Sequence, residues 1–213
     1  MTDTPVRGFY GRWARLYDLL ATLPGVGSWR RQTVAALALD PDDTVVEMGC
    51  GTGANVPYLR QRVSHGRIVG VDLTREMLQR ANTGDDRVDL VQADATRPPI
   101  RTADAILATF VVGLFEQPAR AVDRWCDCVG TGGRVALLNF QRSDRTWAPL
   151  PNLAFEVFVR LASPGGRLSR SSQATTLQRR VRAAREALVG RTTECRFETF
   201  AGGYLGLVVG RVA

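Results

Sequence analysis

The stretch TVVEMGCGTGANVPYL, residues 44–59, places a glycine-rich turn directly behind a strand-forming apolar run. The run ends in an acidic residue, Glu47, and glycines follow at Gly49, Gly51 and Gly53. A bare backbone turn between a buried strand and a helix lets a ligand lie against backbone amides. The same spacing fits the dinucleotide fingerprint G-x-G-x-x-G/A or a turn without a ligand, so the surrounding residues must decide.

Strand and helix patterns alternate along the chain, which predicts a single α/β domain over residues 1–213. We expect a doubly wound, mostly parallel seven-stranded sheet with an antiparallel last strand. The expected strands lie near residues 43–48, 67–73, 87–94, 103–110 and 134–140. The expected helices lie near residues 28–39, from the glycine turn to 63, and near 74–82, 117–129 and 173–189. The final β runs, TECRFETFAGGYLGLVVGRV (193–212), are joined only by Ala-Gly-Gly and therefore form an antiparallel hairpin.

Two further segments extend this core. Residues 1–40 are expected to form N-terminal helices that cap the sheet, and Phe9, Trp13 and Tyr17 share one face of the first helix. Residues 141–172 follow the fifth strand and are too long for a tight loop, so we expect a lid insertion there. The aromatic side chains of that insertion are Trp147, Phe155 and Phe158.

All 28 basic residues are arginines, and the formal net charge is +7. The absence of lysine excludes Schiff-base and lysine-base chemistry. Residues 142–191 hold ten arginines and three acidic residues, so this segment carries the whole excess of positive charge. Two interpretations stay open: a solvated helix face, or a surface for a lipid-like or anionic partner, including peripheral contact with an anionic membrane.

Nothing in the sequence marks a metal site, a spanning helix or a signal peptide. The four cysteines are scattered and too few for a zinc centre; they are Cys50, Cys126, Cys128 and Cys195. The only histidine, His65, precedes the second strand and is expected on the surface. No apolar run approaches the roughly 18 residues that a spanning helix needs. These features favour a cytoplasmic location.

Carboxylates follow the first three strands at the point where each strand ends. Glu47 closes the first strand, Asp72 the second and Asp94 the third. A carboxylate at the position of Asp72 can accept both hydroxyls of an adenosine ribose, and one at Asp94 can accept the adenine amino group. Three such groups beside a glycine turn predict a nucleoside site at the carboxyl ends of the strands.

The motifs VVEMGCGTG, VGVDLTREML and VQADA resemble the first three motifs of class I S-adenosylmethionine-dependent methyltransferases, over roughly residues 43–141. The resemblance implies a Rossmann-like methyltransferase fold, S-adenosylmethionine as cofactor and S-adenosylhomocysteine as product. It places Glu47 near the ammonium group of the cofactor, Asp72 at the ribose, and Asp94 with the amide of Ala95 at the adenine. The full set of positions implied for the cofactor is Tyr17, Glu47, Gly49, Cys50, Gly51, Asp72, Leu73, Asp94, Ala95 and Phe110.

The N-terminal FYGRWARLYDLL is similar to the helix that opens ubiquinone/menaquinone-type and bacterial phosphatidylethanolamine N-methyltransferases. This similarity implies a small-molecule, quinone-like or lipid acceptor. The alternative is that the aromatic face of this helix only packs against the hydrophobic core. Transfer by proximity needs few catalytic groups, and we expect Tyr10, Tyr17 and Asn139 beside the reacting atoms. The fifth strand ends in LLNF, close to the phospholipid enzymes, although they prefer a histidine where this chain has Phe140.

Nucleic acid is disfavoured as the acceptor. The segment after the fourth strand, TFVVGLFEQP, lacks the Asn/Asp-Pro-Pro-aromatic motif with which amino-methylating enzymes hold a flipped base. A nucleic-acid methyltransferase and a non-catalytic S-adenosylmethionine-binding protein nevertheless stay as alternatives. The sequence indicates no oligomeric state.

Overall fold

The computed structural model describes residues 25–81, 83–84, 86–143 and 172–213. The strands are β1 (Thr44–Met48), β2 (Arg67–Asp72), β3 (Val88–Gln92), β4 (Ala105–Thr109), β5 (Arg134–Phe140), β6 (Thr192–Phe200) and β7 (Leu205–Val212). The helices are α2 (Val26–Ala36), α3 (Val56–Arg60), α4 (Arg75–Leu78), α5 (Pro118–Val129) and α7 (Ser172–Gly190), with short 3₁₀ turns η1 (Val112–Leu114) and η2 (Ala201–Gly203). The predicted Rossmann-like fold with a seven-stranded sheet is confirmed.

The strands form one sheet in the order β3-β2-β1-β4-β5-β7-β6. The first five strands pair in parallel, and β7 pairs antiparallel with both β5 and β6. The chain leaves β1 toward β2 and β3 on one side and continues with β4 and β5 on the other. The strand order therefore reverses between β1 and β4, where open α/β sheets bind their ligands. The terminal hairpin is present as predicted, with η2 as its turn.

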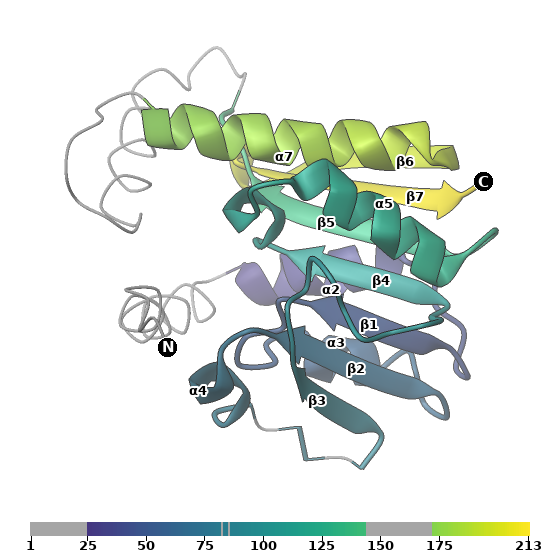
Figure 1. Cartoon of the computed structure of the whole chain (residues 1–213). Coiled ribbons are helices and arrows are strands. Elements are labelled where there is room, and N and C mark those ends of the chain that lie inside the picture. The colour runs from purple at the N-terminus through teal and green to yellow at the C-terminus, as the bar shows by residue number, and fades with distance from the viewer. Residues whose placement is uncertain (1–24, 82, 85, 144–171) are drawn as a thin grey trace.

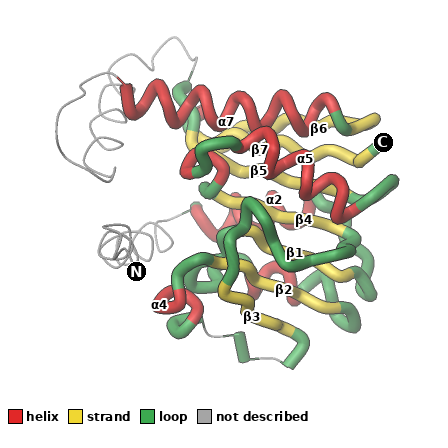
Figure 2. Tube along the Cα trace, viewed as in Figure 1, coloured by secondary structure: helices red, strands yellow, loops and turns green. Residues whose placement is uncertain are grey.

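Helices cover both faces of the sheet (Figures 1 and 2). Helices α5 and α7 pack on one face, around the completely buried Trp125. Helices α2 and α3 pack on the other face, where Leu37 and Leu59 are completely buried. Burial of each large apolar side chain contributes about 1.5–3 kcal/mol, so these two layers supply most of the stabilisation of the sheet.

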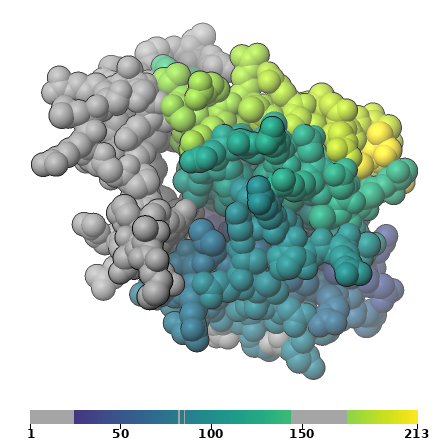
Figure 3. Space-filling model, viewed as in Figure 1, coloured from purple at the N-terminus to yellow at the C-terminus, as the bar shows by residue number. Residues whose placement is uncertain are grey.

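Helix α7 has an apolar stripe that faces the sheet. Val181, Ala184 and Leu188 are buried against the sheet, and on the surface the helix lies beside α5 (Figure 3). A solvated helix face, one of the two interpretations left open for the arginines of this segment, does not describe Arg185. That side chain is half-buried, and its Nη2 donates a hydrogen bond of 3.1 Å to the carbonyl of Gly206 in β7, because α7 lies close over the β5–β7 pair.

Three helices end earlier than predicted, and α2 is one of them, because it ends at Ala36 and not near residue 39. Helix α3 covers only Val56–Arg60, and α4 only Arg75–Leu78. Asn55 stands at the N-cap of α3 but makes no capping bond, because its side chain is engaged in the interior of the protein. Strand β3 also ends before Asp94, which lies in the loop that follows.

Two predicted segments, the first N-terminal helix and most of the lid insertion, lie outside the described residues. Within the described ranges, no helix combines the length and the apolar character needed to cross a membrane.

Candidate functional site

The glycine turn after β1 adopts a conformation that favours glycine. Gly49, Gly51 and Gly53 have φ angles of +71°, +54° and +76°, in the left-handed region. A Cβ on Gly49 would lie 2.6 Å from Cγ2 of Val111, whereas a Cβ on Gly51 would meet no atom of the described residues within 4 Å. Gly49 is therefore needed for packing, and Gly51 borders open space that a ligand can enter.

Asp72 connects the end of β2 to this turn. Its Oδ2 accepts a hydrogen bond of 2.9 Å from the amide of Gly51, and its Oδ1 accepts one of 2.8 Å from the amide of Thr74. Each carboxylate oxygen keeps a further lone pair, so the group is oriented and can still accept bonds from a ligand. The neighbouring Leu73 is 56% exposed, an apolar surface directly beside the carboxylate.

Glu47 lies in the interior with a network of polar partners. Its exposed fraction is 1%, and its Oε1 accepts a hydrogen bond of 2.6 Å from Nδ2 of Asn55. The same nitrogen lies 3.0 Å from Oγ1 of Thr109 in β4, and Nη1 of Arg30 in α2 donates a bond of 2.7 Å to Oδ1 of Asn55. The second carboxylate oxygen of Glu47, Oε2, is buried and has no hydrogen-bond partner in the described part of the chain.

Burial raises the pKa of Glu47 from 4.5 to about 7. The hydrogen bond from Asn55 and the positive charge of Arg30 oppose this rise, and the negative charge of Asp72 adds to it. Near neutral pH the carboxyl group therefore exists in both protonation states. A cation placed at Oε2 would favour the ionised state and would also provide the missing hydrogen bond.

The loop after β3 is fixed from the side of α5. The indole nitrogen of Trp125 donates a hydrogen bond of 2.8 Å to the carbonyl of Ala95. Oδ1 of Asp94 accepts a bond of 2.8 Å from the amide of Thr96. The carboxylate of Asp94 is exposed, while Ala95 is buried. This arrangement holds an acidic group at the carboxyl end of the sheet beside β2.

Two aromatic rings and an amide mark the ends of β4 and β5. Phe110 has a φ of +61°, which is strained for a non-glycine residue, and its ring stacks on Phe140 with 4.6 Å between the centroids. Asn139 is 2% exposed, and its Nδ2 has no hydrogen-bond partner among the described residues. A buried amide donor is thus left available at the end of β5.

The predicted site residues that the structure describes lie together at the ends of β1 to β5. Tyr10 and Tyr17 lie outside the described residues. Cys50 is buried in the turn, and burial together with the charges of Glu47 and Asp72 raises the pKa of its thiol. His65 is a surface residue, as predicted, with 74% of its side chain exposed. No group of side chains in the described ranges is suited to hold a metal ion.

The sequence did not point to Arg30, Asn55 or Thr109. The one available signal was Glu47 itself, because an acid inside an apolar strand needs polar partners. Asn55 bonds directly to Glu47, whereas Arg30 and Thr109 contact Asn55. The three residues come from different elements, so only the packed structure identifies them.

Comparison with known proteins agrees with this geometry. A family model described as a methyltransferase domain matches residues 46–137. A phosphatidylethanolamine N-methyltransferase of Cereibacter sphaeroides is 31% identical over 144 residues, which cover 64% of this chain and 68% of that protein. The chain belongs to the class I S-adenosylmethionine-dependent methyltransferases.

Other proteins that are similar to this methyltransferase are methyltransferases as well. A demethylmenaquinone methyltransferase of Clavibacter sepedonicus is 27% identical over 75% of this chain and 66% of its own length. The methyltransferase thus spans about two thirds of the length of these two relatives. A solved S-adenosylmethionine-dependent methyltransferase of Thermotoga maritima, described as a possible histamine N-methyltransferase, shares the fold. Its TM-score is 0.64 at 17% identity, covering 96% of this chain and 98% of that one. S-adenosylmethionine is the cofactor of the family and of this protein.

Proposed function

We propose that this methyltransferase transfers the methyl group of S-adenosylmethionine to a small lipid-like or quinone-like acceptor. The observation that carries the proposal is Oε2 of Glu47, which is buried and has no hydrogen-bond partner among the described residues. The glycine turn that follows β1 borders open space at Gly51 in the same part of the chain. A methionyl ammonium group would supply the hydrogen bond that Oε2 lacks. The names of the two relatives, demethylmenaquinone methyltransferase and phosphatidylethanolamine N-methyltransferase, support the class of acceptor.

The residues suit the remaining parts of the cofactor as well. In our assignment Gly49, Cys50 and Gly51 present backbone to the methionyl part, and Asp72 accepts the ribose hydroxyls. The exposed side chain of Leu73 covers one face of the adenine. Asp94 and the amide of Ala95 bind its polar edge, and the ring of Phe110 lies beside the cofactor at the end of β4.

When bound, S-adenosylmethionine supplies an electrophilic methyl group on a sulfonium, so the protein needs mainly to orient the acceptor and exclude water. Asn139 offers a buried amide donor that can hold a polar atom of the acceptor. Tyr10 and Tyr17 are proposed to complete the site, with Tyr17 nearest the cofactor. Residues 141–172 are proposed to cover the acceptor as a lid.

Asp72→Ala tests the assignment of the cofactor site. Loss of two charge-assisted hydrogen bonds should weaken S-adenosylhomocysteine binding by about 2–4 kcal/mol in calorimetry. Asp89→Ala is a matched control, because that carboxylate is exposed and pairs with Arg67 on the surface. Equal affinities of the two variants would show that Asp72 does not bind the ribose.

The acceptor is tested by the formation of S-adenosylhomocysteine with demethylmenaquinone and with phosphatidylethanolamine. Turnover with either one supports the proposed class. Turnover with RNA or DNA alone would replace it by a nucleic-acid function, and cofactor binding without turnover on any acceptor would indicate a non-catalytic protein.

A further inference from the structure

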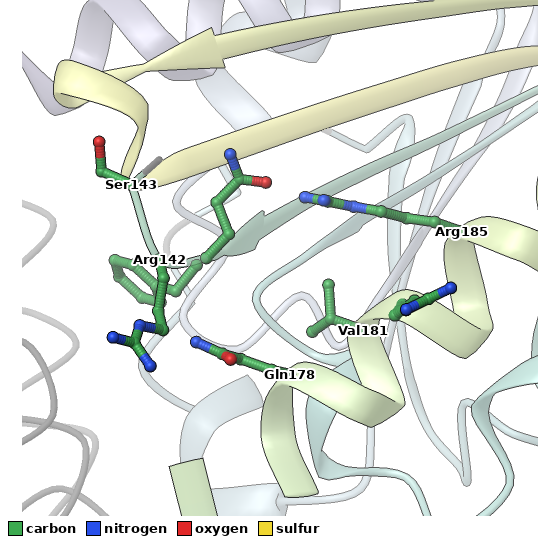
Figure 4. Close-up of a pocket in the computed structure, with 8 residues that line it drawn as sticks. Arg142, Ser143, Gln178, Val181 and Arg185 are labelled. Carbon is green, nitrogen blue, oxygen red and sulfur yellow. The ribbon is translucent and has the colours of Figure 1, made fainter. Parts of the chain in front are cut away.

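A cavity of about 610 Å³ lies between α7 and the end of β5 (Figure 4). Three arginines line it, Arg142 after β5 and Arg182 and Arg185 on α7, together with the amide side chains of Gln141 and Gln178. No acidic side chain is found among its described lining residues. The polar lining is therefore rich in hydrogen-bond donors and positive charge.

Arg185 is the most deeply placed of these cations. Its Nη2 donates to the carbonyl of Gly206, and its Nε is buried without a hydrogen-bond partner in the described structure. Burial lowers the pKa of the guanidinium, and no carboxylate among the described residues offsets that cost. A half-buried cation without a counter-ion favours an anion from outside the chain.

Other groups near Arg185 also favour the binding of an anion. Nε2 of Gln178 is also buried and has no partner among the described residues. Figure 4 shows the side chains of Gln178 and Arg142 turned toward each other, with Arg185 extending from α7 toward the sheet. Gly206 leaves room here, because a Cβ at that position would collide with Oε1 of Gln141 and Nη2 of Arg185. Arg182 is already paired with Glu186 at 2.7 Å and contributes less.

We propose that this cavity binds an oxyanion, a phosphate or carboxylate group, carried by the methyl acceptor. The planar guanidinium of Arg185 matches two oxygens of such a group, and the amide of Gln178 can donate to the same ligand. Phe140 lines the cavity and also stacks on Phe110, so the cavity adjoins the carboxyl ends of β4 and β5. The link to the acceptor rests on the proposed function; the anion site itself does not.

Inorganic phosphate is the probe for the anion site, with acetate as the carboxylate probe and chloride to hold the ionic strength constant. Each salt is titrated into the full chain with S-adenosylhomocysteine bound, and the midpoint of thermal unfolding is followed. Phosphate or acetate should raise the midpoint for the wild type. The same rise should appear for the control variant Arg179→Gln, which removes an exposed arginine of the same helix.

Arg185→Gln should lower the affinity for the anion by about tenfold or more, because a charged donor is lost. Gln178→Leu should also weaken binding, and without anion it should not lower the unfolding midpoint, because it removes a buried donor that has no partner. This second variant keeps the test decisive if Arg185→Gln folds poorly. The proposal is overturned if neither anion raises the unfolding midpoint of the wild type, or if the anions raise it as much in Arg185→Gln and Gln178→Leu as in the wild type.

Failure of the anion site is separable from failure of the proposed function. If S-adenosylhomocysteine binds but neither anion does, only the proposed anion site is wrong. If S-adenosylhomocysteine itself does not bind, the proposed function is wrong. Sedimentation with phosphatidylglycerol vesicles then identifies the source of the anion. Vesicle binding that falls in Arg185→Gln but not in Arg179→Gln indicates a lipid headgroup. Equal vesicle binding, with anion binding still reduced in Arg185→Gln, indicates a free anionic acceptor. Both results support the cavity.

Discussion

Replacing Glu47 with glutamine should remove a pH dependence from cofactor binding. The pKa of Glu47 is raised to about 7, so below that pH most molecules carry a neutral carboxyl group. If the ionised form receives the ammonium group of the ligand, binding must release the proton. Affinity for S-adenosylhomocysteine should then rise about fivefold between about pH 6 and about pH 7, and level off above the pKa.

The glutamine variant keeps the shape of the side chain and an acceptor for Asn55 but has no charge. Its affinity should be nearly independent of pH and, near neutral pH, lower than that of the wild type by about 1.5–3 kcal/mol, the range for a hydrogen bond to a charged group. Calorimetry in two buffers with different ionisation enthalpies would report the released proton directly. A flat affinity profile in the wild type, or the same slope in Glu47→Gln, would refute the role of this carboxylate.

The same raised pKa of Glu47 predicts that the stability of the protein without cofactor falls as the pH rises, whereas the affinity for the cofactor product increases. Because the folded pKa of Glu47 lies above its ordinary value of 4.5, the folded state holds the proton more tightly than the unfolded state. The resulting stabilisation is present below about pH 4.5 and is lost as the pH rises through about 7. Without cofactor, Glu47→Gln should therefore be more stable than the wild type above pH 7, by up to about 3 kcal/mol, and equal to it near pH 4.5. Urea denaturation at the two pH values measures this difference.

Three further predictions concern the turn and the loops. Gly51→Ala should weaken S-adenosylhomocysteine binding and lower the free energy of unfolding by about 1 kcal/mol. Gly49→Ala should lower the unfolding midpoint more than Gly51→Ala does, because its Cβ overlaps Val111. Calorimetry measures the change in binding, and thermal unfolding measures the change in stability. Trp125→Phe leaves the buried carbonyl of Ala95 without its donor and should lower the free energy of unfolding by about 1–3 kcal/mol in urea. Iodoacetamide should modify Cys50 more slowly than Cys195 in the native protein, as mass spectrometry would show, because Cys50 is buried and the pKa of its thiol is raised.

The sequence was sufficient to predict structural features that repeat along the chain or that depend on a short connection between two strands. The alternation of strands and helices predicted the sheet, and the Ala-Gly-Gly turn predicted the antiparallel β6–β7 pair. It could not predict side chains whose environment depends on how helices pack. Arg30 and Arg185 both lie on helices where an arginine normally faces solvent, yet one is buried beside Asn55 and the other is half-buried over β7. Their partners are 25 and 21 positions away, beyond the reach of helical periodicity.

The place of β7 in the sheet has a consequence for how the protein folds. Among the described strands, this one comes last in the sequence, yet it lies between β5 and β6 and is the only strand that pairs with β6. During synthesis β5 therefore has one open edge, and β6 has no strand to pair with, until β7 has been made. Exposed strand edges favour aggregation, so this half of the sheet is the part most in need of protection while the chain is incomplete. Refolding from denaturant should likewise acquire protection of the β6 amides only together with that of β7.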